Sequence, residues 1–235
     1  MQRFRTTKPP ERNLGIASPE IKSADDPAAA PKPTLVLACG ALAREIGAIV
    51  EANRLTHITL HCLPATLHNR PERIPAAVRA AVQKFRPQFP RIFIAYADCG
   101  TGGLLDRVLE EEGLERLPGA HCYAFFTGTE AFAADGERDM RSFFLTDFLA
   151  RQFQSLVIEP LGLDRHPELR DMYFGNYERV VYLAQTDDLA LDAAAEAAAA
   201  RLGLAYERRP TGYGDLATAL RVVGVNPRSE NSSQG

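Results

Sequence analysis

Residues 34–63 read TLVLACGALAREIGAIVEANRLTHITLHCL, and this stretch decides the fold. Its first run, Thr34–Ala38, is continuously apolar, as expected of a strand that is buried on both faces. The apolar residues of Ala41–Asn53 then recur at helical spacing, and those of His57–Leu63 alternate with polar ones. A strand, a helix and a second strand in this order predict two parallel strands joined by a crossover helix.

The same alternation of strands and helices continues along the chain. Later strands are predicted at Arg91–Ala97, His121–Phe126, Arg179–Ala184 and Ala205–Arg208, and helices at Pro71–Phe85, Leu104–Glu112, Thr127–Ala134 and Asp187–Leu202. Residues 135–175 show no clear period and contain an aromatic-rich stretch, Phe143–Phe153. The sequence therefore predicts an α/β fold: a mostly parallel sheet built from repeated strand–helix–strand units, with helices on both faces.

Two of the predicted units carry cysteines at matching positions. In each unit a Cys-Gly pair follows the first strand, and a His-Cys pair ends the second. The separation from Cys39 to Cys62 equals the separation from Cys99 to Cys122. A third unit keeps the strand–helix–strand order without the thiols. We therefore predict an internal repeat of three units, at about residues 34–63, 91–126 and 179–208.

The thiols of Cys39 and Cys99 are predicted at the carboxyl ends of strands, directly before helices. Ligands gather at that edge of an open parallel sheet, and the dipole of a helix start favours a thiolate. The pair therefore predicts a metal site. Burial as a small apolar side chain is the alternative for any one cysteine, and it fits Cys62 best, because Cys62 alternates with apolar residues. No C-x-x-C pattern occurs, so the spacing of a zinc ribbon, a ferredoxin cluster or a thioredoxin is missing.

Two further features accompany the thiols. His68 lies in the short loop 63–71, where it is either a metal ligand or an exposed or helix-capping residue. Gly100, Thr101 and Gly102 precede a helix, and their N–H groups could hold an anionic cofactor. The Lys-Ser/Thr of a P-loop is missing from this segment, so the cofactor signal is weak.

Composition and the chain ends narrow the class of protein. The 235 residues include only four cysteines, too few for a disulfide scaffold, and the net charge of −3 gives no basis for binding nucleic acid. Residues 1–33 and 227–235 are predicted to be disordered tails around a single body, 34–226. Neither a secretion signal nor an apolar run of membrane-spanning length is recognisable, so we predict a cytoplasmic protein with reduced thiols and no membrane partner.

A set of short motifs spread over about residues 34–220 carries a family resemblance. These motifs are Cys39, Leu63-Pro64, Leu67-His68-Asn69-Arg70-Pro71, Asp98-Cys99-Gly100-Thr101-Gly102, Ala120-His121-Cys122, Gly128-Thr129-Glu130, Phe143-Phe144-Leu145-Thr146 and Gly214-Asp215-Leu216. With them the chain resembles the prokaryotic family called domain of unknown function 1638. Members of that family keep a cysteine–glycine turn followed by a His/Cys pair.

The resemblance implies a role beside corrinoid chemistry, because genes of this family often neighbour those of corrinoid proteins, methyltransferases and corrinoid-activating ATPases. The expected setting is cobalamin-dependent methyl transfer or one-carbon metabolism, with a corrinoid carried by a partner protein. The repeated units also resemble three-lobed enzymes such as quinolinate synthase, in which each lobe offers one cysteine to an iron–sulfur cluster.

We therefore expect a metal- or iron–sulfur-binding protein that acts in or beside corrinoid-dependent methyl transfer. Its thiolate ligands would be Cys39, Cys99 and Cys122, and the fourth ligand would be His68 or His121. Zinc or an iron–sulfur cluster suits such soft donors. Whether His121 or Cys122 is the ligand, and whether the protein is catalytic, stays open.

Two other functions fit the same sequence. The first is a non-catalytic module that docks on a corrinoid protein or methyltransferase through Phe143–Phe153, although this stretch is more simply part of the core. The second is thiol redox chemistry between Cys39 and Cys99, which requires their Cα atoms to lie about 4.4–6.8 Å apart.

Overall fold

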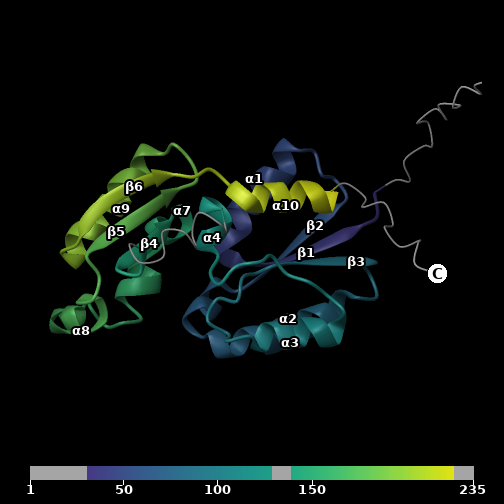
Figure 1. The fold of residues 1–235 in the computed structure, drawn as a ribbon, viewed down its shortest axis with the longest axis horizontal. Helices are drawn as coiled ribbons and strands as arrows, with labels where there is room; N and C mark the ends of the chain where they lie inside the picture. Colours follow the sequence, from purple (N-terminus) through teal and green to yellow (C-terminus); the bar gives the residue numbers. More distant parts are fainter. Residues whose placement is uncertain (1–30, 129–138, 225–235) are drawn as a thin grey trace, which may run out of the picture. The chain divides into compact units, whose positions relative to one another are not determined.

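Figure 1 shows the chain as a computed structural model, which describes residues 31–128 and 139–224. The strands are β1 (Thr34–Cys39), β2 (Ile58–Leu63), β3 (Arg91–Ala95), β4 (Ser142–Thr146), β5 (Arg179–Ala184) and β6 (Ala205–Pro210). The helices are α1 (Ala43–Ala52), α2 (Ile74–Phe85), α3 (Leu104–Glu112), α4 (Tyr123–Thr127), α7 (Asp147–Arg151), α8 (Arg170–Phe174), α9 (Leu189–Leu202) and α10 (Gly214–Gly224). Shorter helical turns include η1 (Gly40–Leu42), η2 (Ala65–Asn69), η3 (Pro71–Arg73), η4 (Gln154–Ile158) and η5 (Pro167–Leu169).

The first sheet has the strand order β2-β1-β3, and all its strands are parallel. The central strand β1 pairs on both sides, so that Val36 lies opposite Leu60 of β2 and Phe93 of β3. The side chains of Leu35–Ala38 have no exposed surface. A strand that is buried on both faces gains nothing from alternating polar residues, which explains its continuous apolar run. The predicted strand–helix–strand unit of residues 34–63 is confirmed.

Helices cover both faces of this first sheet (Figure 1). Val36 and Ala38 of β1 pack in one cluster with side chains of α1, α4 and α10. Leu37 points to the opposite face and packs with side chains of α2 and α3. Alternation along one strand therefore supplies two separate cores, and the prediction of helices on both faces is confirmed for this sheet.

The second sheet has the strand order β4-β5-β6 and is also entirely parallel. Its crossover helix α9 begins at Asp188, whose side chain accepts hydrogen bonds from the N–H groups of Ala190 and Leu191, and ends at Gly203 with φ 64°. Small side chains such as Ala195 let this helix lie close to the sheet. The predicted unit of residues 179–208 is confirmed, but the strands form two three-stranded sheets rather than one.

The strand predicted at His121–Phe126 is wrong. The chain there leaves a turn and forms the short helix α4; among the residues that the structure describes, an isolated bridge between Ile94 and Arg116 is the only pairing that extends the edge at β3. Phe125 and Phe126 both enter the core beneath α1 and α10. A short apolar run is compatible with either a strand or a helix, so its pattern did not distinguish the two. The second predicted repeat unit therefore lacks its second strand.

The aromatic stretch Phe143–Phe153 belongs largely to the second sheet and its core. Phe144 lies on β4, and Phe153 packs beneath α9; both are 8% exposed. These two buried rings offer no docking surface, whereas Phe143 and Phe148 are half-buried, and docking through this stretch stays a prediction. Most of the helix predicted at Thr127–Ala134 and nearly all of both predicted tails, 1–33 and 227–235, lie outside the described residues.

A buried polar network sits at the carboxyl end of the second sheet. The side chain of Asp147, only 2% exposed, accepts hydrogen bonds from the Tyr182 hydroxyl (2.8 Å), the Gln185 N–H (3.0 Å) and the Thr186 hydroxyl (2.6 Å). The Gln185 side-chain oxygen accepts in turn from the Asp147 N–H at 2.7 Å. A buried carboxylate with this many donors fixes the junction between β4, β5 and α7.

Glu45 of α1 lies close enough to Asp147 to be affected by its charge, but one oxygen of the Glu45 carboxyl group lacks a hydrogen-bond partner among the described residues. Glu45 is 4% exposed, and its Oε2 atom has no hydrogen-bond partner in the described part of the chain. Burial raises the pKa of this carboxyl, the nearby Asp147 raises it further, and Arg151 partly opposes the shift.

We expect Glu45→Gln to change how stability depends on pH. Because the folded-state pKa is raised above the unfolded value of 4.5, the contribution of Glu45 is fully present below that value and is lost as pH rises through the folded pKa. Urea unfolding from about pH 5 to pH 8 should therefore show a smaller decline for Glu45→Gln than for the unchanged chain. Glu51→Gln, at an exposed site on the same helix, is the control and should leave the decline unchanged. Equal declines in all three chains would contradict this account.

Candidate functional site

Cys39 ends β1 at the carboxyl edge of the first sheet, where the chain turns into η1. The turn needs a glycine next to it, because a Cβ on Gly40 would lie 2.9 Å from the Leu63 carbonyl oxygen. Burial raises the pKa of the Cys39 thiol to about 11, although the Ala41 N–H hydrogen-bonds to its sulfur. The Tyr96 hydroxyl, 1% exposed, lies close to this sulfur but has no partner at hydrogen-bonding geometry among the described residues.

Cys99 lies beyond the end of β3 in a strained turn. Its φ is 50°, in the left-handed region that non-glycine residues rarely adopt, and the next residue, Gly100, has φ 83°. Two backbone hydrogen bonds anchor the turn. The Cys99 N–H donates to the Ala120 carbonyl at 2.8 Å, and the Asp98 N–H donates to the Gly119 carbonyl at 3.1 Å. These bonds hold the Cys99 thiol against the segment that carries His121 and Cys122.

The loop after Cys99 folds around the Asp98 carboxylate. This carboxylate accepts hydrogen bonds from the Thr101 hydroxyl (2.6 Å) and from the N–H groups of Gly102 (3.2 Å) and Gly103 (2.9 Å). Of the N–H groups predicted to hold a cofactor, that of Gly102 is therefore already bonded to the protein's own carboxylate. The prediction that Gly100, Thr101 and Gly102 bind a cofactor has no support in these contacts.

Cys122 stands at the N-terminal end of α4 and pairs with Cys99. Both the thiol and the backbone N–H of Cys122 lie within hydrogen-bonding reach of the Cys99 sulfur, and they lower the pKa of Cys99 despite its burial. The same contact, together with burial, raises the pKa of Cys122. The contact therefore shifts the pKa values of the two thiols in opposite directions, down for Cys99 and up for Cys122.

The two predicted histidines lie beside this pair. His68 is in η2, exposed on one side and facing the thiols on the other. Partial burial of its ring and the proximity of His121 lower the pKa of His68, which favours the neutral imidazole that binds metals. His121 is exposed, and the centroid of its ring lies 6.3 Å from the ring centroid of Tyr123.

The predicted ligands line two cavities that share residues. The smaller cavity has a volume of about 20 Å³ and is lined by residues that include Cys39, His68, Cys99, Cys122 and Tyr96. The second, of about 250 Å³, is lined by His68, Cys99, Gly100, His121, Cys122 and Tyr123. The structure thus brings all five predicted ligands to one place. It does not arrange them as ligands: within residues 31–128 and 139–224, no three His, Cys, Asp or Glu side chains are grouped closely enough to hold a metal ion.

Cys62 lines neither of these two cavities. It is on the edge strand β2, opposite Ala38 in the register, and packs against the core beneath α1. This agrees with its interpretation as a small packing residue. Sequence reasoning missed the tyrosines of the site, Tyr96 and Tyr123, although each lies within three residues of a predicted ligand.

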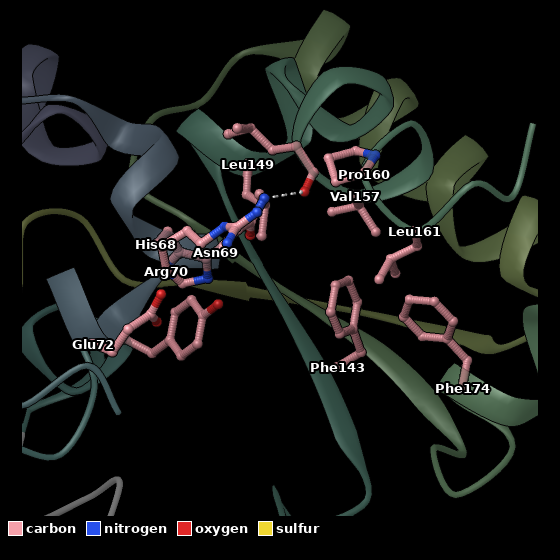
Figure 2. A pocket seen from close by; sticks show the side chains of 12 residues that line it. His68, Asn69, Arg70, Glu72, Phe143, Leu149, Val157, Pro160, Leu161 and Phe174 are labelled. Carbon is pink, nitrogen blue, oxygen red and sulfur yellow. Dashed lines mark hydrogen bonds between the residues drawn. The ribbon is translucent and has the colours of Figure 1, made fainter. Parts of the chain in front are cut away.

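A third, larger cavity of about 630 Å³ adjoins the site (Figure 2). His68 and Tyr123 line both this cavity and the one of about 250 Å³. Its other lining residues are Asn69, Arg70, Glu72, Phe143, Leu149, Leu156, Val157, Pro160, Leu161 and Phe174. The thiol site therefore lies next to a space of the size that small organic ligands occupy in proteins.

Comparison with known proteins places the chain in a family. The family model described as "Protein of unknown function (DUF1638)" matches residues 62–220, which confirms the resemblance, and the chain belongs to this family. No curated protein and no solved structure matches the chain. In the segments that the structure describes, no helix is both long and apolar enough to cross a bilayer.

Proposed function

We propose that the chain is a soft-metal-binding protein in which Cys39, Cys99 and Cys122, with His68 as a fourth ligand, close around the metal on uptake, because in the described part of the chain they stand too far apart to hold it as they are. The observation that carries this proposal is that these four residues line one cavity of about 20 Å³. A space of that size holds a single water or ion. It favours zinc over an iron–sulfur cluster, which needs more room, and it favours His68 over His121, which does not line it.

The electrostatics of the cavity support the same proposal. Zinc binds thiolates, so uptake would release the protons that burial keeps on Cys39 and Cys122, and affinity would rise with pH. Cys99, whose pKa is lowered, is the natural first ligand. The unsatisfied hydroxyl of Tyr96 could then donate a hydrogen bond to a metal-bound thiolate, as outer residues of metal sites do.

The proposed role is methyl transfer beside a corrinoid protein or methyltransferase, a setting suggested by the family resemblance. Three thiolates would be fixed by the first sheet and α4, whereas His68, on a short exposed turn, could be displaced by a substrate thiol. Zinc would lower the pKa of a bound thiol and so supply a thiolate; its sulfur would form the new bond to the methyl group as the cobalt–carbon bond of a partner's methylcorrinoid breaks, with the electron pair left on the cobalt. The cavity of about 250 Å³ gives such a thiol access to the metal beside Cys99 and Cys122.

Zinc content and zinc affinity test the proposal. After anaerobic purification, the chain should contain about one zinc ion per molecule, and Cys99→Ser should weaken zinc binding by on the order of 100-fold or more in competition with a chelator. Cys62→Ser is the matched control, since Cys62 lies outside the cavity, and should bind zinc like the unchanged chain. Circular dichroism verifies that both variants fold. Substoichiometric zinc, or equal affinity in the two variants, would refute the proposal.

A second function, thiol redox chemistry, is favoured by the Cys99–Cys122 contact. The sequence suggested Cys39 as the partner of Cys99, and the mutual pKa shifts of Cys99 and Cys122 favour Cys122 in that role. Thiol–disulfide exchange would pass two electrons and two protons from this pair to a disulfide acceptor, with a mixed disulfide on Cys99 as intermediate. A reversible Cys99–Cys122 disulfide in a glutathione redox buffer, identified by peptide mapping of a zinc-free chain, would favour this function over metal binding.

A further inference from the structure

The cavity of about 630 Å³ has one polar side and one apolar side (Figure 2). The polar side comes from the segment after β2 and carries His68, Asn69, Arg70 and Glu72. The opposite side comes from the second half of the chain and is made of aromatic and aliphatic side chains. Small-molecule sites in proteins combine a mostly apolar lining with a few polar groups that orient the ligand.

Arg70 is the unpaired cation of the polar side. Its backbone N–H donates to the Leu67 carbonyl, but no residue in the described segments forms a hydrogen bond or ion pair with its guanidinium. The acidic neighbour, Glu72, instead lies 3.9 Å from Arg73. Asn69 is already used, since its side-chain amide donates to the Leu156 carbonyl at 3.3 Å. The cavity therefore presents a guanidinium with free donors, in a lining that also contains the Glu72 carboxylate.

The apolar side is built from the second core. Phe143 and Phe174 form an edge-to-face pair with ring centroids 5.2 Å apart, and Leu161 lies beside them in the cavity wall (Figure 2). Phe143 is half-buried and Phe174 almost fully buried, so the ring of Phe143 is the one with surface left for a ligand. A flat apolar group would bury area against this ring and the aliphatic side chains around it.

We propose that this cavity binds an organic anion: a molecule with an apolar, ring-sized body against Phe143 and Leu161 and a carboxylate or similar group at Arg70. A planar guanidinium matches a carboxylate in two-point hydrogen bonding, which sets the orientation of the ligand. His68 and Tyr123, which also line the cavity of about 250 Å³, stand between this ligand and Cys99. The claim that this cavity holds a substrate of the thiol site rests on the proposed function. The claim that it binds an organic anion does not.

Two fluorescent probes of similar ring structure test the inference. Anilinonaphthalene sulfonate carries the anion, and phenylnaphthylamine lacks it. Arg70→Gln should weaken binding of the sulfonate about tenfold or more, because a hydrogen bond to a charged group contributes about 1.5–3 kcal/mol, and should leave binding of the neutral probe unchanged. Arg107→Gln, the same change at an exposed residue of α3 outside the cavity lining, should affect neither probe. Leu161→Gln should weaken both.

The outcomes separate this inference from the metal proposal. Cys99→Ser should leave both probe affinities within about twofold, because that thiol does not line the large cavity. A chain that binds no zinc but shows the Arg70 effect would overturn only the metal proposal. Equal losses of both probes in Arg70→Gln, or a sulfonate affinity that responds equally to Arg70→Gln and Arg107→Gln, would overturn the anion site, whatever the zinc content.

Discussion

Replacing Asp147 by alanine should lower the free energy of unfolding by about 3–5 kcal/mol. The substitution removes the acceptor for the Tyr182 hydroxyl, the Gln185 N–H and the Thr186 hydroxyl at once. Tyr182 is completely buried, and Gln185 is 6% exposed, so water cannot replace the lost oxygen atoms without opening the fold. The cost therefore comes from donors left unsatisfied rather than from the lost side chain itself.

Asp187→Ala is the matched control for that prediction. The Asp187 side chain is 95% exposed and forms a surface ion pair with Arg208 at 2.9 Å. Exposed pairs of this kind contribute about 0–1 kcal/mol. Urea unfolding followed by circular dichroism compares the two variants with the unchanged chain. Similar small losses in both variants would mean that the Asp147 network is not structural.

The second large effect is expected at Gly214, the first residue of α10. Its φ is 45°, and a Cβ built there would lie against the carbonyl oxygens of Phe125 and Phe126, closer than side-chain carbons approach in proteins. These two carbonyls belong to α4, so Gly214→Ala must push α10 away from α4. We expect a loss of about 3 kcal/mol or more, from left-handed backbone strain and steric overlap together.

Gly212→Ala distinguishes the two contributions. Gly212 has a similar φ of 59°, but a Cβ there would meet nothing within 4 Å. This variant should therefore lose only about 1–2 kcal/mol, from backbone strain alone. Because α4 begins directly after Cys122, zinc affinity should fall in Gly214→Ala and stay unchanged in Gly212→Ala. Thermal unfolding and chelator competition measure both effects. A Gly214 variant as stable as the Gly212 variant would contradict this reasoning.

The parts of the fold that could be predicted are those with continuous apolar strands. Thr34–Ala38 and Arg179–Ala184 are the central strands of the two sheets, and burial on both faces gives them an unambiguous pattern. β4 (Ser142–Thr146) was not predicted, because it lies in a longer aromatic stretch in which apolar and polar residues do not alternate. The division into two sheets depends on which strands pair, and periodicity carries no information about pairing.

The site was predicted in outline because strand ends are recognisable in sequence. Cys39 and Cys99 follow apolar runs, and parallel strands place such ends at a common edge. Cys122 was included as the end of a strand, yet it reaches the site from the start of a helix. The turn bonds from Cys99 and Asp98 to residues 119 and 120 produce that approach, and a sequence does not reveal such long-range backbone bonds. Arg70 was quoted only as part of a motif, since its lack of a partner is a property of the folded chain.

The position of Tyr123 sets the smallest part of this protein that can work alone. Its ring packs on Phe144 of the second sheet, at 5.4 Å between centroids, while the neighbouring Cys122 faces the thiols of the first sheet. A fragment that contained the first sheet only would keep Cys39, Cys99 and the backbone bonds to residues 119 and 120, but it would lose the packing of Tyr123 on Phe144 directly beside the third thiol. The thiol centre is therefore not a portable module that can be cut out or grafted onto another scaffold. The site depends on both sheets, and a working fragment would need both of them.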